Sequence, residues 1–183
     1  FPYTTLFRSV KFGYSELEPF PDKVIANIPY NITTPLIWNL LKFAGLGLKY
    51  HLYMLQKEAA ERLTAPPDTK ARYPLGVCVE AMGHACVVRN IPPECFRPVP
   101  EVQSALTEIV LERNLGLACD ERWSGLLHKG FAHRRKTLAN NLKGIEAGEF
   151  CLGRKRAEDL TSEEWLRLYA CVIACPPGPP ESL

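Results

Sequence analysis

The fold of this chain is decided by one stretch, KVIANIPYNITTP at residues 23–35. Its first six residues are mostly β-branched or apolar, which is typical of a buried parallel strand, and Pro29 stops that strand. The Thr-Thr-Pro triplet can then begin a helix, with Thr33 or Thr34 as its cap and Pro35 in its first turn. Apolar residues continue at helical spacing to residue 41. The stretch therefore predicts a strand followed by a helix.

The same alternation continues along the chain. A second strand is predicted at residues 50–55, followed by a helix at 56–63 and a further helix at 74–83. Two more strands are predicted at 85–91 and 103–112, and a proline-rich link at 92–100 joins them. This order predicts an α/β fold with a doubly wound sheet, and the last two strands can form an antiparallel edge. After a linker at 114–120, amphipathic helices at 121–133, 136–142 and 162–174 predict a small all-helical domain.

Composition excludes several classes of protein. With 183 residues, 46% hydrophobic and 23% charged, the chain is neither disordered nor collagen-like nor a disulfide miniprotein. Its longest apolar stretches, 35–41 and 169–174, are far shorter than the roughly 20 residues that span a bilayer. Seven cysteines without a Cys-x-x-Cys pair predict reduced thiols, most of them buried, and no zinc site. We expect a cytoplasmic monomer with no membrane partner.

The net charge of +2 is unevenly distributed. Residues 1–127 carry 13 basic and 13 acidic side chains, residues 128–156 carry eight and two, and residues 157–183 carry one and five. A basic block in an otherwise neutral chain favours an anionic partner. The alternative is a solvated helix face without a partner.

The first strand ends in a group of residues suited to one demanding reaction. Ligands of doubly wound sheets lie beyond the carboxyl ends of the strands, where Asn27, Pro29 and Tyr30 fall. Methyl transfer to the exocyclic amine of a nucleobase needs two acceptors for the amine hydrogens, and the Asn27 side-chain oxygen and the Pro29 carbonyl could supply them. Tyr30 could stack on the flipped base, and no strong base is required. The alternative is a strand that simply ends at a proline, with Tyr30 in the core.

Four motifs occur in order and favour the first interpretation. They are NIPYNITTP at 27–35, MLQKE at 54–58, FRPVPEVQSA at 96–105 and FAHRRKT at 131–137. The set resembles the ribosomal RNA adenine dimethyltransferases, specifically the bacterial small-subunit enzymes, and the resemblance extends from about residue 10 to residue 174.

The resemblance implies a Rossmann-like methyltransferase that uses S-adenosylmethionine. Its expected product is N6,N6-dimethyladenosine at two adjacent positions near the 3′ end of small-subunit (16S) rRNA. Asn27, Pro29 and Tyr30 would form the catalytic motif, with Asn27 also near the methyl donor. Phe96 would pack against the target base opposite Tyr30; alternatively, it is a core residue beneath the proline-rich link.

The resemblance also implies a role for the basic block. Lys129, Arg134, Arg135, Lys136 and Lys143 would contact phosphates of the rRNA in the immature small ribosomal subunit. Such contacts carry no sequence information, so recognition would depend on RNA shape and on the flipped base.

The chain also departs from the family pattern. Glu101 and Gln103 replace a basic residue and an aspartate, and residues 70–75 lack a glycine after the aromatic. Three alternatives therefore stay open: a large-subunit rRNA enzyme, against which the basic run argues, a DNA adenine methyltransferase, and a non-catalytic rRNA-binding or ribosome-assembly factor.

A strand followed by a Gly-rich turn and an acidic residue is expected in a nucleotide-binding half-domain, and this chain shows none. Its one Gly-x-Gly, residues 45–47, follows a helix and predicts a loop or helix cap. Residues 1–9 resemble the translation of a sequencing adaptor; the alternative is a divergent native strand.

These features give an expected domain plan. Residues 1–9 would be non-native, 10–114 part of a methyltransferase domain, 115–175 a helical RNA-binding domain and 176–183 a proline-rich tail. Such a chain would lack most of the cofactor pocket and be inactive.

Overall fold

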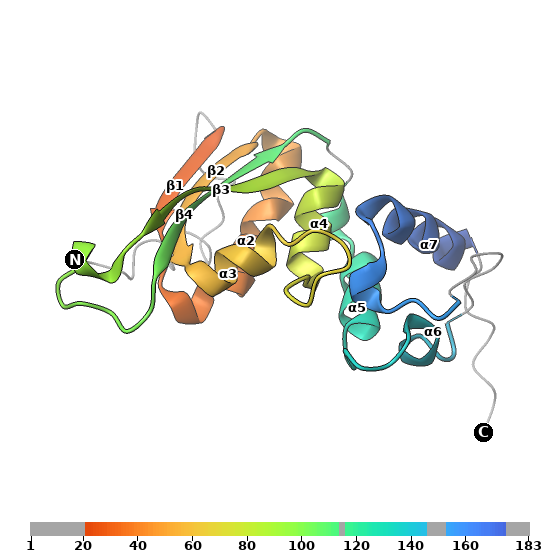
Figure 1. Ribbon diagram of the computed structural model, residues 1–183. Coiled ribbons are helices and arrows are strands. Elements are labelled where there is room, and N and C mark those ends of the chain that lie inside the picture. Colours follow the sequence, from red (N-terminus) through yellow and green to blue (C-terminus); the bar gives the residue numbers. More distant parts are fainter. Residues whose placement is uncertain (1–20, 114–115, 146–152, 175–183) are drawn as a thin grey trace, which may run out of the picture.

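A computed structural model describes residues 21–113, 116–145 and 153–174 (Figure 1). The proposed adaptor segment 1–9, residues 114 and 115 of the linker, and the tail 176–183 lie outside these residues. The strands are β1 (Lys23–Asn27), β2 (Tyr50–Gln56), β3 (Gly83–Ile91) and β4 (Ser104–Leu111). The α-helices are α2 (Thr33–Leu41), α3 (Lys57–Leu63), α4 (Pro74–Met82), α5 (Glu121–Gly130), α6 (Leu138–Asn141) and α7 (Ser162–Ala174). Short 3-10 helices include η2 (Tyr30–Ile32), η3 (Lys42–Leu46), η4 (Pro93–Cys95), η5 (Leu117–Cys119) and η6 (Ala157–Asp159).

The described strands form one mixed sheet in the order β1-β2-β4-β3. β1 and β2 are parallel, with Asn27 beside Met54, while β4 runs antiparallel to both of its neighbours, β2 and β3. The predicted strand–helix alternation and the antiparallel pairing of the last two strands are confirmed. Because β1 and β2 are parallel neighbours, their carboxyl ends lie next to each other at one end of the sheet.

Helices α2, α3 and α4 cover one face of the sheet (Figure 1). Along β2, residues alternate between buried and half-buried positions, so only one face is fully enclosed. The prediction of a buried β1 is wrong: its side chains alternate between exposed and half-buried, and Ile25 is 73% exposed. The reason is that β1 lies at an edge of the described sheet and has no described helix on its outer face.

Two predicted helix ends are also wrong. Ile32, not a threonine, is the N-cap of α2, and the Thr33 hydroxyl donates to the Pro29 carbonyl instead. Helix α5 ends at Gly130 rather than at residue 133 because the buried Asn141 amide donates to the carbonyls of Gly130 and His133, at 2.5 and 3.1 Å. The predicted helix 136–142 is correspondingly shortened to Leu138–Asn141.

Two glycines meet demands that other residues could not. A Cβ on Gly83, between α4 and β3, would lie 2.0 Å from the carbonyl oxygen of Val110. Gly47 ends η3 with φ of +107°, a left-handed conformation that favours glycine. The prediction that residues 45–47 form a helix cap is thus confirmed.

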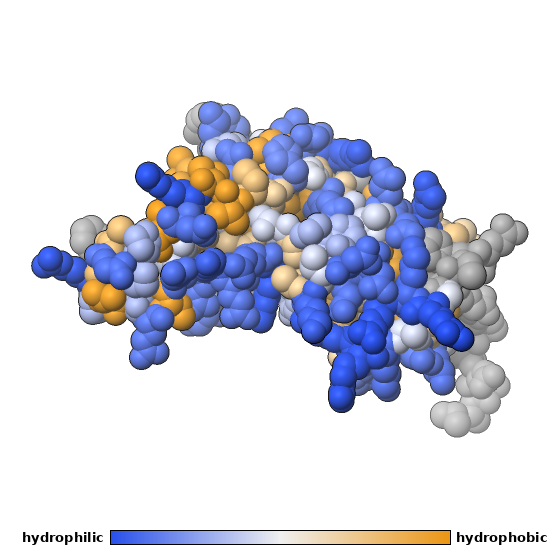
Figure 2. All heavy atoms as spheres, in the orientation of Figure 1, coloured by the Kyte–Doolittle hydropathy of each residue, from blue (hydrophilic) through white to orange (hydrophobic). Residues whose placement is uncertain are grey.

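Residues after the sheet form a helical lobe whose core is continuous with that of the sheet. Trp123 and Trp165 are fully buried, in the same cluster as Val77 and Met82 of α4. Figure 2 shows that the outer surface of this lobe is mainly hydrophilic. No helix in the described ranges is long and apolar enough to cross a membrane.

The prediction that most cysteines are buried is wrong for the residues that the structure describes. Cys78 is buried, and burial raises the pKa of its thiol to about 12. Cys86, Cys95 and Cys119 are exposed, because the first lies on the outer sheet face and the others lie in short 3-10 turns.

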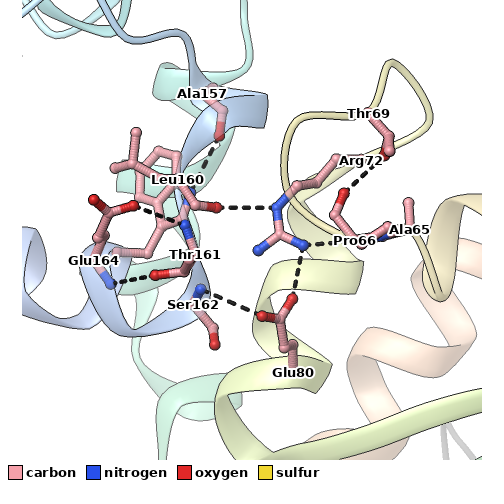
Figure 3. Close-up of polar contacts among 11 residues, drawn as sticks. Ala65, Pro66, Thr69, Arg72, Glu80, Ala157, Leu160, Thr161, Ser162 and Glu164 are labelled. Atoms are coloured by element: carbon pink, nitrogen blue, oxygen red, sulfur yellow. Dashed lines mark hydrogen bonds and ion pairs between the residues drawn. The ribbon is translucent and has the colours of Figure 1, made fainter.

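A buried arginine joins the helical lobe to the sheet lobe (Figure 3). The Arg72 side chain is 0% exposed, and its Nε donates to the Leu160 carbonyl at 3.1 Å. Its Nη1 donates both to the Ala65 carbonyl, at 2.9 Å, and to the Glu80 carboxylate, at 2.7 Å. Glu80 also accepts from the Ser162 backbone at 3.5 Å. Residues before α4, the helix α4 and the start of α7 are therefore held at one point.

Candidate functional site

A hollow lies beyond the carboxyl end of β1, where the sequence predicted the site. We call it the proline hollow; its lining residues are Asn27, Ile28, Pro29, Tyr30, Phe96, Arg97, Pro98 and Pro100. It is shallow, with a volume of about 500 Å³. The fold thus brings Asn27, Pro29 and Tyr30 to the same place as Phe96, which is more than 60 residues away in sequence.

Asn27 occupies the last position of β1, and its side chain is exposed. The next residue, Ile28, is buried and continues the pairing, because its N–H donates to the Met54 carbonyl at 3.3 Å. Within the described residues the Asn27 amide has no hydrogen-bond partner, although the backbone beneath it is fixed. Its oxygen is therefore free to accept from a ligand.

The Pro29 carbonyl, the second predicted acceptor, is already engaged. It accepts from the N–H of Ile32, in η2, at 3.1 Å and from the hydroxyl of Thr33, the first residue of α2, at 3.4 Å. A carbonyl oxygen has two lone pairs, so a base amine would have to displace one donor. The hydroxyl is the weaker partner because its distance is longer and it can rotate away.

Tyr30 is half-buried and is not part of the core. Its hydroxyl forms a hydrogen bond of 2.8 Å with the Ser104 hydroxyl at the start of β4, and Ser104 is fully buried. This bond fixes one end of the ring and leaves the ring itself as a wall of the hollow. The ring is thereby held ready for stacking without an ordering cost on binding.

Phe96 follows η4 in the link between β3 and β4. It is half-buried and does not belong to the core cluster of the described residues, which disagrees with the alternative that it is a core residue. It lines the proline hollow together with Pro98 and Pro100. Two aromatic rings, from η2 and from the β3–β4 link, therefore border one hollow.

The basic residues lie at a different place, on and beside the turn between α5 and α6. Arg135 and Lys136 are exposed and belong to this turn, and their side chains have no partner among the described residues. Arg134, in contrast, donates to the backbone carbonyl of Lys70 and pairs with Glu158 at 3.7 Å. Lys129 and Lys143 are exposed nearby, and the Lys129 ammonium donates to the Lys143 carbonyl at 3.3 Å. Lys136, which the sequence placed at the start of the predicted helix 136–142, lies in this turn and outside α6. In Figure 1 this turn lies at the bottom of the helical lobe, and the β3–β4 link lies at the opposite, left-hand end of the molecule.

A sequence profile of the family described as "Ribosomal RNA adenine dimethylase" matches residues 15–173. The chain belongs to this family. The match covers the first strand, the proline hollow and the basic turn, so the resemblance inferred from the four motifs is confirmed.

Members of the adenine dimethylase family from several bacteria are similar to this chain. It is 40% identical over 173 residues to "Ribosomal RNA small subunit methyltransferase A" of Saccharophagus degradans, covering 87% of this chain and 63% of that protein. The protein of the same name from Synechocystis is 40% identical over 171 residues, covering 83% of this chain and 60% of the relative. This chain thus spans about 60% of the length of these relatives.

Solved structures confirm the α/β, Rossmann-like methyltransferase fold expected of the dimethylase family. A dimethyladenosine transferase from Plasmodium falciparum superposes with a TM-score of 0.68 at 25% identity, covering 81% of this chain and 66% of that one. The 23S rRNA methyltransferase ErmE gives a TM-score of 0.57 at 20% identity, covering 88% and 70%. The second likeness is one of fold alone.

Sequence reasoning missed the residues that support the family motif. Ser104 lies inside a quoted motif, but its bond to Tyr30 joins residues 74 positions apart and is invisible along the chain. In the sequence, Arg72 stands out only as part of the stretch 70–75 that lacks a glycine. Its burial, the one property that would have marked it, depends on how the two lobes pack.

Proposed function

We propose that this chain carries the target-base site and the rRNA-binding surface of an enzyme that dimethylates N6 of two adjacent adenosines near the 3′ end of small-subunit rRNA. Residues 10–114 would serve the chemistry and residues 115–175 the RNA. The observation that supports this proposal is that Asn27, Pro29, Tyr30 and Phe96 border one hollow. The chain that forms this hollow is 40% identical to a small-subunit rRNA methyltransferase.

The proline hollow can hold a flipped adenine between Tyr30 and Phe96. Stacking of a base on an aromatic ring contributes roughly 1–3 kcal/mol. The unpartnered Asn27 oxygen would accept one N6 hydrogen, and the Pro29 carbonyl would accept the other once the Thr33 hydroxyl turns away. Holding both hydrogens favours a pyramidal amine with its lone pair available for attack.

Among the residues that the structure describes, no carboxylate or histidine lines the proline hollow. None is needed, because the amine becomes acidic once it is methylated and gives its proton to water. S-adenosylmethionine would supply the methyl group, and the free Asn27 amide at the end of a parallel strand fits a residue near that donor. The described residues contribute no Gly-rich strand–turn–helix for the rest of the cofactor, since Gly47 only ends η3.

Mass spectrometry of methylated adenosine tests the proposal. The proteins are this chain alone and this chain fused to the portion of the Saccharophagus degradans relative that the match leaves uncovered. The substrates are small ribosomal particles that lack the modification, 23S rRNA fragments and duplex DNA.

We expect the fusion to form N6,N6-dimethyladenosine only in the small-subunit particle. Modification of 23S rRNA or DNA instead would assign the chain to another methyltransferase class. Tight binding to the small particle with no transfer by the fusion would favour a non-catalytic assembly factor.

A further inference from the structure

A second hollow adjoins the proline hollow and shares Tyr30 with it. We call it the Tyr73 hollow; besides Tyr30, its lining includes Thr34, Gln56, Arg62, Tyr73 and Gly76. It is smaller, with a volume of about 150 Å³, and is lined more by polar than by apolar atoms. That volume is roughly ten times what one water molecule requires, so the hollow has room for a ligand much larger than water. Nothing in the chemistry proposed above uses it.

The Tyr73 hollow lies beyond the carboxyl end of β2, just as the proline hollow lies beyond the carboxyl end of β1. Gln56 is the last residue of β2, and Asn27 is the last residue of β1. Because the two strands are adjacent and parallel, both amides lie at the same end of the sheet. This is where α/β sheets bind their ligands.

The walls of the Tyr73 hollow are fixed before any ligand arrives. Helix α4 approaches α3 so closely that a Cβ on Gly76 would lie 2.8 Å from the Arg62 carbonyl oxygen. Tyr73 follows directly after Arg72, whose side chain is buried and bonded to Ala65, Glu80 and Leu160. Tyr73 itself remains 37% exposed. A ligand therefore enters a preformed space and orders few side chains.

We propose that the Tyr73 hollow binds the base of the nucleotide next to the target adenosine. This inference rests on the proposed function: two adjacent adenosines are modified, so while one of them occupies the proline hollow the other must lie close beside it. The two hollows share Tyr30 as a wall, which places a second base one side chain away from the first.

The chemistry of the Tyr73 hollow suits an adenine. The Gln56 amide has no partner among the described residues, and such an amide can donate to N7 and accept from N6 of adenine at the same time. On the corresponding edge uracil offers only its O4 acceptor, so Gln56 makes two hydrogen bonds with an adenine and one with a uracil presented in the same way. The exposed face of Tyr73 can stack on either of them.

The mouth of the Tyr73 hollow also fits a nucleotide. The Arg62 guanidinium pairs with Glu58, and their side chains are 51% and 70% exposed. An exposed pair of this kind contributes little to stability, so Arg62 can turn to a phosphate at small cost. A phosphate also offers Arg62 a bidentate partner.

A binding experiment with this chain tests the inference without requiring catalysis. The probes are fluorescent RNA hairpins of the small-subunit 3′ end that carry A-A, A-U or U-A at the two target positions. Either single replacement leaves one adenosine for the proline hollow and removes the adjacent adenosine that would occupy the Tyr73 hollow. The variants are Gln56→Ala and, as a matched control, Gln103→Ala, another glutamine, which does not line the Tyr73 hollow and accepts from Lys57.

We expect the wild-type chain and Gln103→Ala to bind the A-A hairpin about tenfold more tightly than the A-U and U-A hairpins. Gln56→Ala should reduce this preference to less than threefold. Gln56→Glu, which loses the donor to N7, should reduce it as well. Tyr73→Leu should weaken binding to all three hairpins by about tenfold while keeping the preference.

An unchanged preference in Gln56→Ala overturns the inference, and so does a wild-type chain that binds all three hairpins equally. In both cases the proposed function survives if the hairpins still bind more tightly than a scrambled RNA. Failure of the proposed function looks different, because the wild-type chain then shows no preference for any small-subunit hairpin over the scrambled sequence.

Discussion

Asn27 shows how much a single amide can contribute at a strand end. Its side chain is exposed and unpartnered within the described residues, while Ile28 beside it is anchored in the core. In the fusion with the Saccharophagus degradans relative, we expect Asn27→Ala to lower kcat by at least about 100-fold, because one of two acceptors for the target amine is lost. Single-turnover methyl transfer measures this, and full activity would refute the assigned role.

Folding of the Asn27→Ala variant should be unaffected, since the side chain makes no contact that the fold requires. Asn31→Ala is a matched control, because Asn31 is an exposed asparagine in η2 that does not line the proline hollow. The Asn31→Ala variant is expected to keep its activity within about twofold of that of the wild-type protein.

Arg72 is a single residue that we expect to affect stability, as we expect Asn27 to affect activity. Its removal would leave the Ala65 and Leu160 carbonyls without their donor and would leave Glu80 without its cation. We expect Arg72→Met to lower the free energy of unfolding by about 3 kcal/mol, with part of the loss relieved because Glu80 is 38% exposed and can be hydrated.

Urea denaturation measures the cost of removing Arg72. Lys70→Met is the control, because Lys70 is an exposed cation on the same loop and should change stability by less than about 0.5 kcal/mol. The double variant Arg72→Met/Glu80→Leu should lose less than the sum of the two single changes, since neither charge is then left alone. Strict additivity would contradict the coupling.

At the scale of elements, β1 is the one whose environment differs most from its sequence pattern. Its apolar residues predicted burial on both faces, yet Ile25 is 73% exposed, and Figure 2 shows hydrophobic residues gathered over the strands. An exposed apolar edge strand favours association between copies. We expect Ile25→Lys to reduce aggregation, measured by light scattering against protein concentration, and to change stability by less than about 0.5 kcal/mol.

Ile28→Lys is the matched comparison, since Ile28 is 1% exposed at the end of the same strand. Burial of an unpaired ammonium should unfold the protein. If Ile25→Lys is equally damaging, β1 is covered on its outer face and its exposure is not the cause of association.

The turn between α5 and α6 is an element whose charges divide into two roles. Arg135 and Lys136 project into solvent, whereas Arg134 is used to join the lobes. For the small-subunit hairpin, Arg135→Ala/Lys136→Ala should lower the slope of log affinity against log salt by about 1.5, which corresponds to two lost phosphate contacts. The control is the double variant Lys42→Ala/Lys49→Ala, which removes two exposed lysines of the sheet lobe and should leave the slope unchanged.

Titration of a buried histidine should affect the stability of the whole molecule. His51 is 0% exposed; its Nδ1 lies 2.7 Å from the Tyr53 hydroxyl, and burial lowers the pKa of His51 to about 4. The unfolded chain, with a pKa near 6.5, takes up the proton first as pH falls, so stability is lost between pH 6.5 and 4. We expect unfolding free energy to be about 1 kcal/mol lower at pH 5.5 than at pH 7.5.

His51→Gln should remove this pH dependence, while His133→Gln, at an exposed site, should keep it. Urea denaturation at the two pH values gives the comparison. A wild-type protein whose stability is equal at both values would show that the ring accepts a proton inside the fold.

The sequence by itself determined the order of strands and helices, the family and the short motif beyond β1. These depend on residues close together in the chain, where hydrophobic period, proline position and turn residues act locally. Asn27, Pro29 and Tyr30 could be identified because they are contiguous, and Phe96 because its motif resembles that of a known family. Helix ends were less predictable, since Asn141 ends α5 from 11 residues away.

Only the tertiary structure decided what depends on distant partners. The bond that fixes Tyr30 comes from Ser104, the partners of Arg72 include Leu160 of the other lobe, and the Tyr73 hollow forms because Gln56 and Tyr73 are brought beside Tyr30. The exposure of Ile25 likewise reflects which elements surround β1 and not its own residues. Burial and long-range hydrogen bonds are properties of packed pairs, and the order of residues along the chain does not contain those pairs.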